Sequence, residues 1–84
     1  MNTVTRRNYN KKKGKVLYEC SYVDSLINFM TYQVRDKIEG LGEMEDDDFV
    51  DIERSGRIIA TMYSNDESEL SRVMYYLNKE KERN

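Results

Sequence analysis

Apolar and polar side chains alternate from Lys15 to Tyr22, so that every second residue falls on the same face. This alternation, with β-branched and aromatic residues at the apolar positions, predicts a β-strand. Leu17 falls on the opposite face of that strand. The residues that share the first face are Val16, Tyr18, Cys20 and Tyr22.

The spacing of apolar residues changes after Tyr22, and they then recur mainly three or four positions apart. That period places them on one stripe of an amphipathic helix, and Gly40 stands where a left-handed C-cap would end it. The residues of the stripe are Val23, Leu26, Ile27, Met30, Val34 and Ile38.

Residues 48–64 predict a β-hairpin with its turn at Arg54, Ser55 and Gly56. A two-residue turn would place the like charges of Arg54 and Arg57 opposite each other, whereas a three-residue turn pairs Glu53 with Arg57. We expect the three-residue turn, because it also gathers the apolar residues on one face. Those residues are Val50, Ile52, Ile58, Ala60 and Met62.

A last apolar stripe, formed by Leu70, Val73, Met74 and Leu77, predicts a second helix. Ser64 and Glu67 would begin it as a capping box. The expected order is β-α-β-β-α, with no internal repeat. A right-handed crossover makes the first two strands parallel, and the third strand then fits between them. The sequence thus predicts an α+β fold, a split β-α-β with a three-stranded antiparallel sheet and two helices on one face.

Charge is distributed unevenly along the chain. Residues 1–15 carry six basic and no acidic side chains, whereas residues 16–84 carry eight basic and sixteen acidic ones. The first segment also lacks an apolar period, which is typical of a mobile terminus. We therefore expect a flexible basic N-terminal arm over residues 1–14, an α+β domain over residues 15–79 and a frayed C-terminus over residues 80–84.

The residue types that the chain lacks narrow its chemistry. It has no histidine and one cysteine, so neither a structural zinc site nor a histidine-dependent catalytic site is expected. No glycine-rich phosphate loop is present. We expect a binding protein rather than an enzyme, with no cofactor and no metal. A single thiol favours a reducing cytoplasm, and no apolar run approaches the roughly 20 residues that span a bilayer.

Two surfaces are candidates for protein contact. Four large residues are expected on the sheet face that the helices leave open, namely Leu17, Phe49, Ile59 and Tyr63. Such a patch indicates a protein-binding or homodimer surface, unless the arm or the acidic loop covers it. The acidic residues Glu43, Glu45, Asp46, Asp47 and Asp48 would fit a cationic groove on a larger host protein. Their commonest meaning is a solvated loop, and their spacing is not that of a calcium-binding loop.

Two functional hypotheses follow from these surfaces. The first is a regulator or inhibitor that acts by stoichiometric contact with a larger protein. A composition rich in Lys, Asn, Tyr and Asp suits a low-GC bacterium or its phage. The second is a nucleic-acid-binding accessory factor, whose arm would contact phosphates and stack a tyrosine on a base. Its binding residues would be Arg6, Arg7, Tyr9, Lys11, Lys12, Lys13 and Lys15. The acidic body counts against the second hypothesis, because it repels a phosphate backbone.

Overall fold

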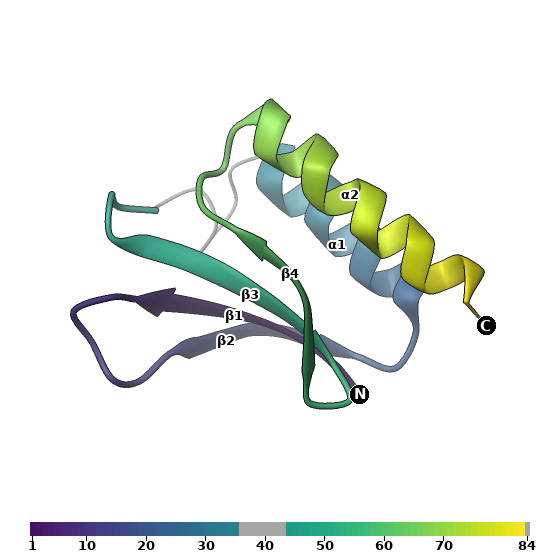
Figure 1. Cartoon of the computed structure of the whole chain (residues 1–84), viewed down its shortest axis with the longest axis horizontal. Helices are drawn as coiled ribbons and strands as arrows, with labels where there is room; N and C mark the ends of the chain where they lie inside the picture. The colour runs from purple at the N-terminus through teal and green to yellow at the C-terminus, as the bar shows by residue number, and fades with distance from the viewer. Residues whose placement is uncertain (36–43, 84) are drawn as a thin grey trace.

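The computed structural model describes the backbone of residues 1–35 and 44–83, and the side chains of 1–32 and 44–83. Within these residues the protein has an α+β fold with a four-stranded antiparallel sheet and two helices, and both helices cover the same face of the sheet (Figure 1). The elements are β1 Asn2–Asn8, β2 Lys15–Cys20, α1 Val23–Arg35, β3 Asp48–Arg54, β4 Arg57–Met62 and α2 Glu67–Glu82.

The N-terminal segment is a central strand of the sheet. The strand order is β2-β1-β3-β4, and β1 is antiparallel to both of its neighbours. The predicted flexible arm is therefore wrong for residues 2–8, and the predicted sheet is one strand short. Val4 is fully buried, but the other buried residues of this strand are the polar Asn2 and Thr5. Because these buried positions are polar, β1 has no alternating apolar pattern that a sequence search could detect.

The split β-α-β arrangement is present, but the strand between its two parallel strands is not the predicted one. Since β2 and β3 are each antiparallel to β1, they run parallel to each other, as a crossover through α1 requires. We expected the last strand to lie between them. Instead β1 occupies that place, and β4 lies at the edge of the sheet.

The β3–β4 hairpin has a two-residue turn. Ser55 and Gly56 have φ angles of 52° and 80°, and Arg54 pairs with Arg57. Positive φ at both central positions is the type I′ geometry that matches the twist of a hairpin, and Gly56 adopts it without strain. The predicted three-residue turn, with Glu53 opposite Arg57, is therefore wrong.

Each hairpin also contains a β-bulge in its outer strand. The pairing passes over Leu17 in β2 and over Ile59 in β4. An extra residue shifts the alternation of faces by one position. The bulge in β4 pairs Ile52 with Ala60 and so places both on the core face despite the short turn, and both of these side chains are buried.

The two halves of the chain repeat one ββα unit. The segments β1-β2-α1 and β3-β4-α2 have the same order, with the inner strands paired at the centre and the outer strands at the edges. Their internal registers match residue for residue: Val4 pairs with Tyr18 as Ile52 pairs with Ala60, and a bulge follows in each case. Val4 and Ile52 also face each other across the middle of the sheet. The sequence showed no repeat, so this two-fold arrangement exists only in the structure.

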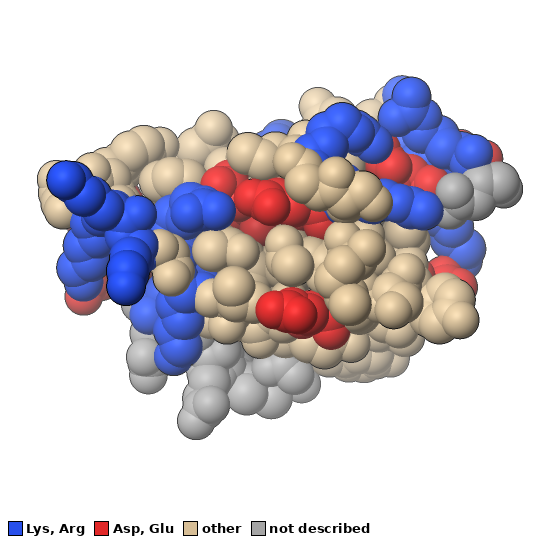
Figure 2. All heavy atoms as spheres, turned by 90° about the horizontal axis from the view of Figure 1, so that it is seen from below, with Lys and Arg blue, Asp and Glu red and all other residues tan. Residues whose placement is uncertain are grey.

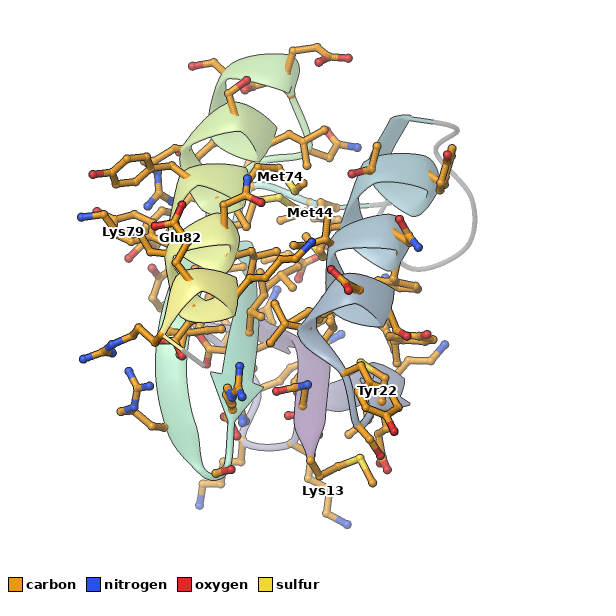
Figure 3. All side chains as sticks on the ribbon, turned by 90° about the vertical axis from the view of Figure 1, so that its right-hand side faces the viewer. Lys13, Tyr22, Met44, Met74, Lys79 and Glu82 are labelled. Atoms are coloured by element: carbon orange, nitrogen blue, oxygen red, sulfur yellow. The ribbon has the colours of Figure 1, made fainter. Side chains whose placement is uncertain are left out.

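The core lies between the sheet and the helices. α1 and α2 pack against each other, α2 also against β4 and α1 against β2. Figure 3 shows Met44 and Met74 pointing into the space between the helices, where both pack on the core. The fully buried apolar residues are Val4, Leu26, Met30, Val50, Ile52, Met62, Val73 and Leu77.

The helix ends differ from the predicted ones. Asp66, rather than Ser64, is the N-cap of α2, and it accepts a hydrogen bond from the backbone N–H of Glu69 at 2.9 Å. α2 continues to Glu82, so the predicted frayed end is wrong for residues 80–82. The predicted C-cap at Gly40 and the stripe residue Ile38 lie outside the described residues, as does the side chain of Val34.

Candidate binding surface

The open face of the sheet has a polar, ion-paired centre. Arg7 Nε donates to Asp51 Oδ2 at 2.9 Å, and Arg7 Nη2 donates to Glu53 Oε1 at 3.5 Å. Thr61 Oγ1 donates to the other oxygen of Asp51 at 3.0 Å. Asp51 is only 6% exposed, although no helix covers this face. The network joins β1, β3 and β4 and holds these side chains in place.

Apolar side chains flank this centre on both edge strands. Val16 on β2 pairs with Thr5, and Ile58 on β4 pairs with Glu53. Paired residues project from the same face, so Val16 and Ile58 lie on the open side. They are 50% and 53% exposed. Figure 2 views this face and shows the acidic side chains near its centre.

The predicted apolar patch is only partly assembled. Phe49, which pairs with Arg7, lies on the open face, where the Tyr9 ring packs against it with 4.6 Å between centroids. Tyr63 follows β4 and is 58% exposed. Leu17 and Ile59 instead pack against the core.

The cause of this error is the same in both hairpins. Val16 and Ile58 were expected on the core face, and Leu17 and Ile59 on the open face. Each bulge exchanges the faces of two adjacent residues, Val16 with Leu17 and Ile58 with Ile59, because the extra residue reverses the alternation from that point. No signal in the sequence marks either bulge.

The acidic segment lies against the loop that connects β1 and β2. Asn8 Nδ2 donates to Asp48 Oδ1 at 2.7 Å, and Asn10 Nδ2 donates to Asp47 Oδ2 at 2.8 Å. The backbone N–H of Tyr9 donates to the Asp47 carbonyl at 3.1 Å. The basic and acidic segments are therefore neighbours.

Hydrogen bonds from both segments lower the pKa of Asp48. A hydrogen bond from the Glu45 backbone N–H lowers the pKa of Asp48, with a further contribution from Asn8 and smaller ones from the Arg6 and Lys11 charges. Asp48 is therefore firmly ionised and held in place. Glu45, Asp46 and Asp47 are exposed, and Glu43 lies outside the described residues.

A polar cleft of about 350 Å³ lies beside the β1–β2 loop. Figure 2 shows one group of basic side chains at this end of the molecule, on the left, and a second group at the opposite end. The cleft is lined by Arg6, Arg7, Asn8, Lys11, Lys13, Gly14, Lys15, Glu45 and Asp48. The structure thus brings together five of the seven residues predicted for nucleic-acid contact, while Tyr9 and Lys12 lie on the same loop outside the cleft.

The chain matches no protein-family model, no curated protein and no solved structure. Within the part that the structure describes, neither helix is long and apolar enough to cross a membrane. Function is therefore inferred from the geometry of the open sheet face and of the basic cleft.

Proposed function

We propose that this protein is a non-enzymatic regulator or inhibitor that contacts a larger protein through the open face of its sheet. The supporting observation is that Val16 and Ile58, on opposite edges of that face, leave about half of their surface in water, at 50% and 53% exposure. Between them, Arg7 and its carboxylate partners are already ordered. Exposed apolar residues around satisfied polar groups can be buried by a partner at a low entropic cost.

The size of the face indicates that a partner also contacts a second surface. Strands about 4.8 Å apart and roughly 20 Å long give a four-stranded face of about 400 Å². A stable interface covers about 800 Å² on each partner. The exposed acids Glu45, Asp46 and Asp47 immediately precede the strand that carries Phe49. They extend the contact surface toward a partner with a cationic groove.

The proposed setting is the cytoplasm, because Cys20 is a free thiol. A phage or another mobile element of a low-GC bacterium would be a natural source for so small a regulator. A stoichiometric regulator needs no catalytic group, only a surface that blocks or remodels its target.

The test is a paired substitution on the open face. Val16→Lys with Ile58→Lys places two charges where the partner would bury apolar surface, and edge strands tolerate lysine. The matched control is Tyr22→Lys with Tyr32→Lys. Tyr22 immediately precedes α1 and is 74% exposed, and Tyr32 lies on α1 and is 62% exposed. Tagged variants would be used to capture the partner from host lysate, with circular dichroism to confirm folding.

We expect the sheet-face variant to lose the partner that the wild type and the control both retain. A folded sheet-face variant that captures the same partner in the same amount would contradict the proposal. Sedimentation of the wild type over a range of concentrations separates a homodimer formed through this face from a complex with another protein.

A further inference from the structure

Most basic side chains in the described part of the chain have a partner. Arg7 is paired with Asp51, Arg72 with Glu69 and Lys81 with Asp24. Arg57 and Arg83 share Glu80, Lys79 lies over the Tyr75 ring, and Arg6 and Arg54 also make contacts. Lys11, Lys12, Lys13 and Lys15 are different, because they form no ion pair with any described residue. The unpaired positive charge is therefore concentrated at the β1–β2 loop.

The loop that carries these lysines is held in place. The backbone N–H groups of Asn10 and Lys11 donate to the side chain and the carbonyl of Asn8, at 2.9 and 3.0 Å. Gly14 lies so close to β1 that an added Cβ would be 2.8 Å from Thr5 Cγ2. Like charges carried on one short segment repel one another, and a bound anion relieves that repulsion.

The cleft among these side chains has the size and charge of an anion site. Its volume of about 350 Å³ lies within the usual range for ligand pockets, about 300–1,000 Å³. Five of its lining residues are basic and two are acidic, which leaves a net charge of +3. Of the five, Arg7 is held by Asp51 and Glu53, and Arg6 also has a partner, so Lys11, Lys13 and Lys15 are the unpaired donors.

We propose that the β1–β2 loop binds single-stranded nucleic acid, with the phosphates in this cleft and a base stacked on Tyr9. Lys11, Lys13 and Lys15 stand at every second position along the loop and the start of β2, which suits successive phosphates. Tyr9 is 66% exposed even though its ring packs on Phe49, so it remains accessible to a base. Stacking on an aromatic side chain requires an unpaired base, which selects a single strand over a duplex. This binding is distinct from the protein contact proposed for the open face, although Arg7 and Glu45 belong to both surfaces.

The test measures how binding of a fluorescein-labelled oligothymidylate varies with salt concentration. The variant Lys11→Gln/Lys13→Gln/Lys15→Gln removes the unpaired donors of the cleft. The matched control, Lys79→Gln/Lys81→Gln/Arg83→Gln, removes the same charge from the end of α2. Each phosphate contact to a single strand contributes about 0.7 to the slope of log K against log salt. We expect the cleft variant to flatten this slope by about 2 and to bind at least about tenfold more weakly at low salt, with the control unchanged.

Tyr9→Leu separates stacking from charge. Leucine still packs on Phe49 but offers no aromatic face, so we expect about tenfold weaker binding with an unchanged salt slope. A role of Tyr9 in folding alone would leave the affinity of the folded variant unaltered.

Three results would overturn the proposal. The first is that the folded wild type fails to bind the oligonucleotide. The second is that both triple variants lose affinity equally, which would mean that net charge alone matters. The third is that the loop binds vesicles of anionic phospholipid but not the oligonucleotide, which would assign the lysines to a membrane surface. Tighter binding to the single strand than to a duplex of the same length supports the stacking role of Tyr9.

Discussion

Glu80 shows how one buried carboxylate can join two elements. It is 8% exposed near the end of α2, and it accepts hydrogen bonds from Arg57 at 3.0 Å and Arg83 at 3.2 Å. The Arg57 hydrogen bond is the main reason that the pKa of Glu80 lies below its ordinary value of 4.5. Arg57 begins β4, so this contact holds the last turn of α2 against the sheet.

We predict that Glu80→Gln lowers the free energy of unfolding by about 1 kcal/mol near neutral pH, the usual value for such hydrogen-bonded pairs. Because the pKa of Glu80 is lower in the folded state than in the unfolded state, its stabilisation is present above 4.5 and is lost as pH falls through the folded value. Urea unfolding at about pH 7 and about pH 3 should therefore show a difference between wild type and variant that becomes smaller in acid.

Glu82→Gln is the control for this prediction. Glu82 lies two residues further along α2 on its exposed surface, as Figure 3 shows. It should change the stability by less than about 0.5 kcal/mol. Equal effects of the two substitutions at both pH values would mean that the Glu80 ion pairs do not stabilise the fold.

At the scale of elements, β1 is the segment whose role is least apparent in the sequence. Among the described residues it is the only strand that pairs with β2, and it also pairs with one edge of β3. Six of the seven residues of this strand are polar or charged, but backbone hydrogen bonds to two neighbours stabilise a central strand whatever its side chains are. Local pattern cannot show this, since the pairing partners lie far away in the chain.

We predict that deleting residues 1–8 abolishes folding, because β2 then has no partner and Val4 leaves the core. Far-UV circular dichroism and the dispersion of amide NMR signals would measure the loss. The variant Lys11→Gln/Lys13→Gln/Lys15→Gln, which removes charge from the same region, should stay folded. A dispersed, native-like spectrum from the truncated chain would show that β1 is dispensable. Truncation of the basic N-terminus is therefore a test of folding and cannot distinguish nucleic-acid binding from protein binding.

At the scale of the whole molecule, the two ββα units form a single core. Val4 from the first unit and Ile52 from the second pair at the middle of the sheet, and both are fully buried. The helices of the two units also pack against each other. Each unit alone would expose the edge of its inner strand and the side of its helix that the other unit covers.

We predict that fragments 1–43 and 44–84 are each unfolded, whereas the intact chain unfolds in one cooperative transition. Two strands with one helix bury too little apolar surface, and units near 40 residues seldom fold without a disulfide or a metal. Thermal melts followed by far-UV circular dichroism and by tyrosine signals should coincide for the intact chain. A cooperative melt in either fragment would show that its unit is independently stable.

The sequence by itself determined that both helices and the strands β2, β3 and β4 exist, and hence the α+β class. Each of these elements has a local apolar period, and local periods depend only on neighbouring residues. It also showed which residue types could carry charge or apolar contact, including the lysines of the cleft.

Only the tertiary structure decided how those residues are placed. It made residues 2–8 a central strand, exchanged Val16 with Leu17 and Ile58 with Ile59 through two bulges, and set the acidic segment beside the basic loop. Each of these outcomes depends on hydrogen bonds or charges between segments far apart in the chain. A one-dimensional period contains no information about such contacts, because strand pairing and electrostatic attraction act through space.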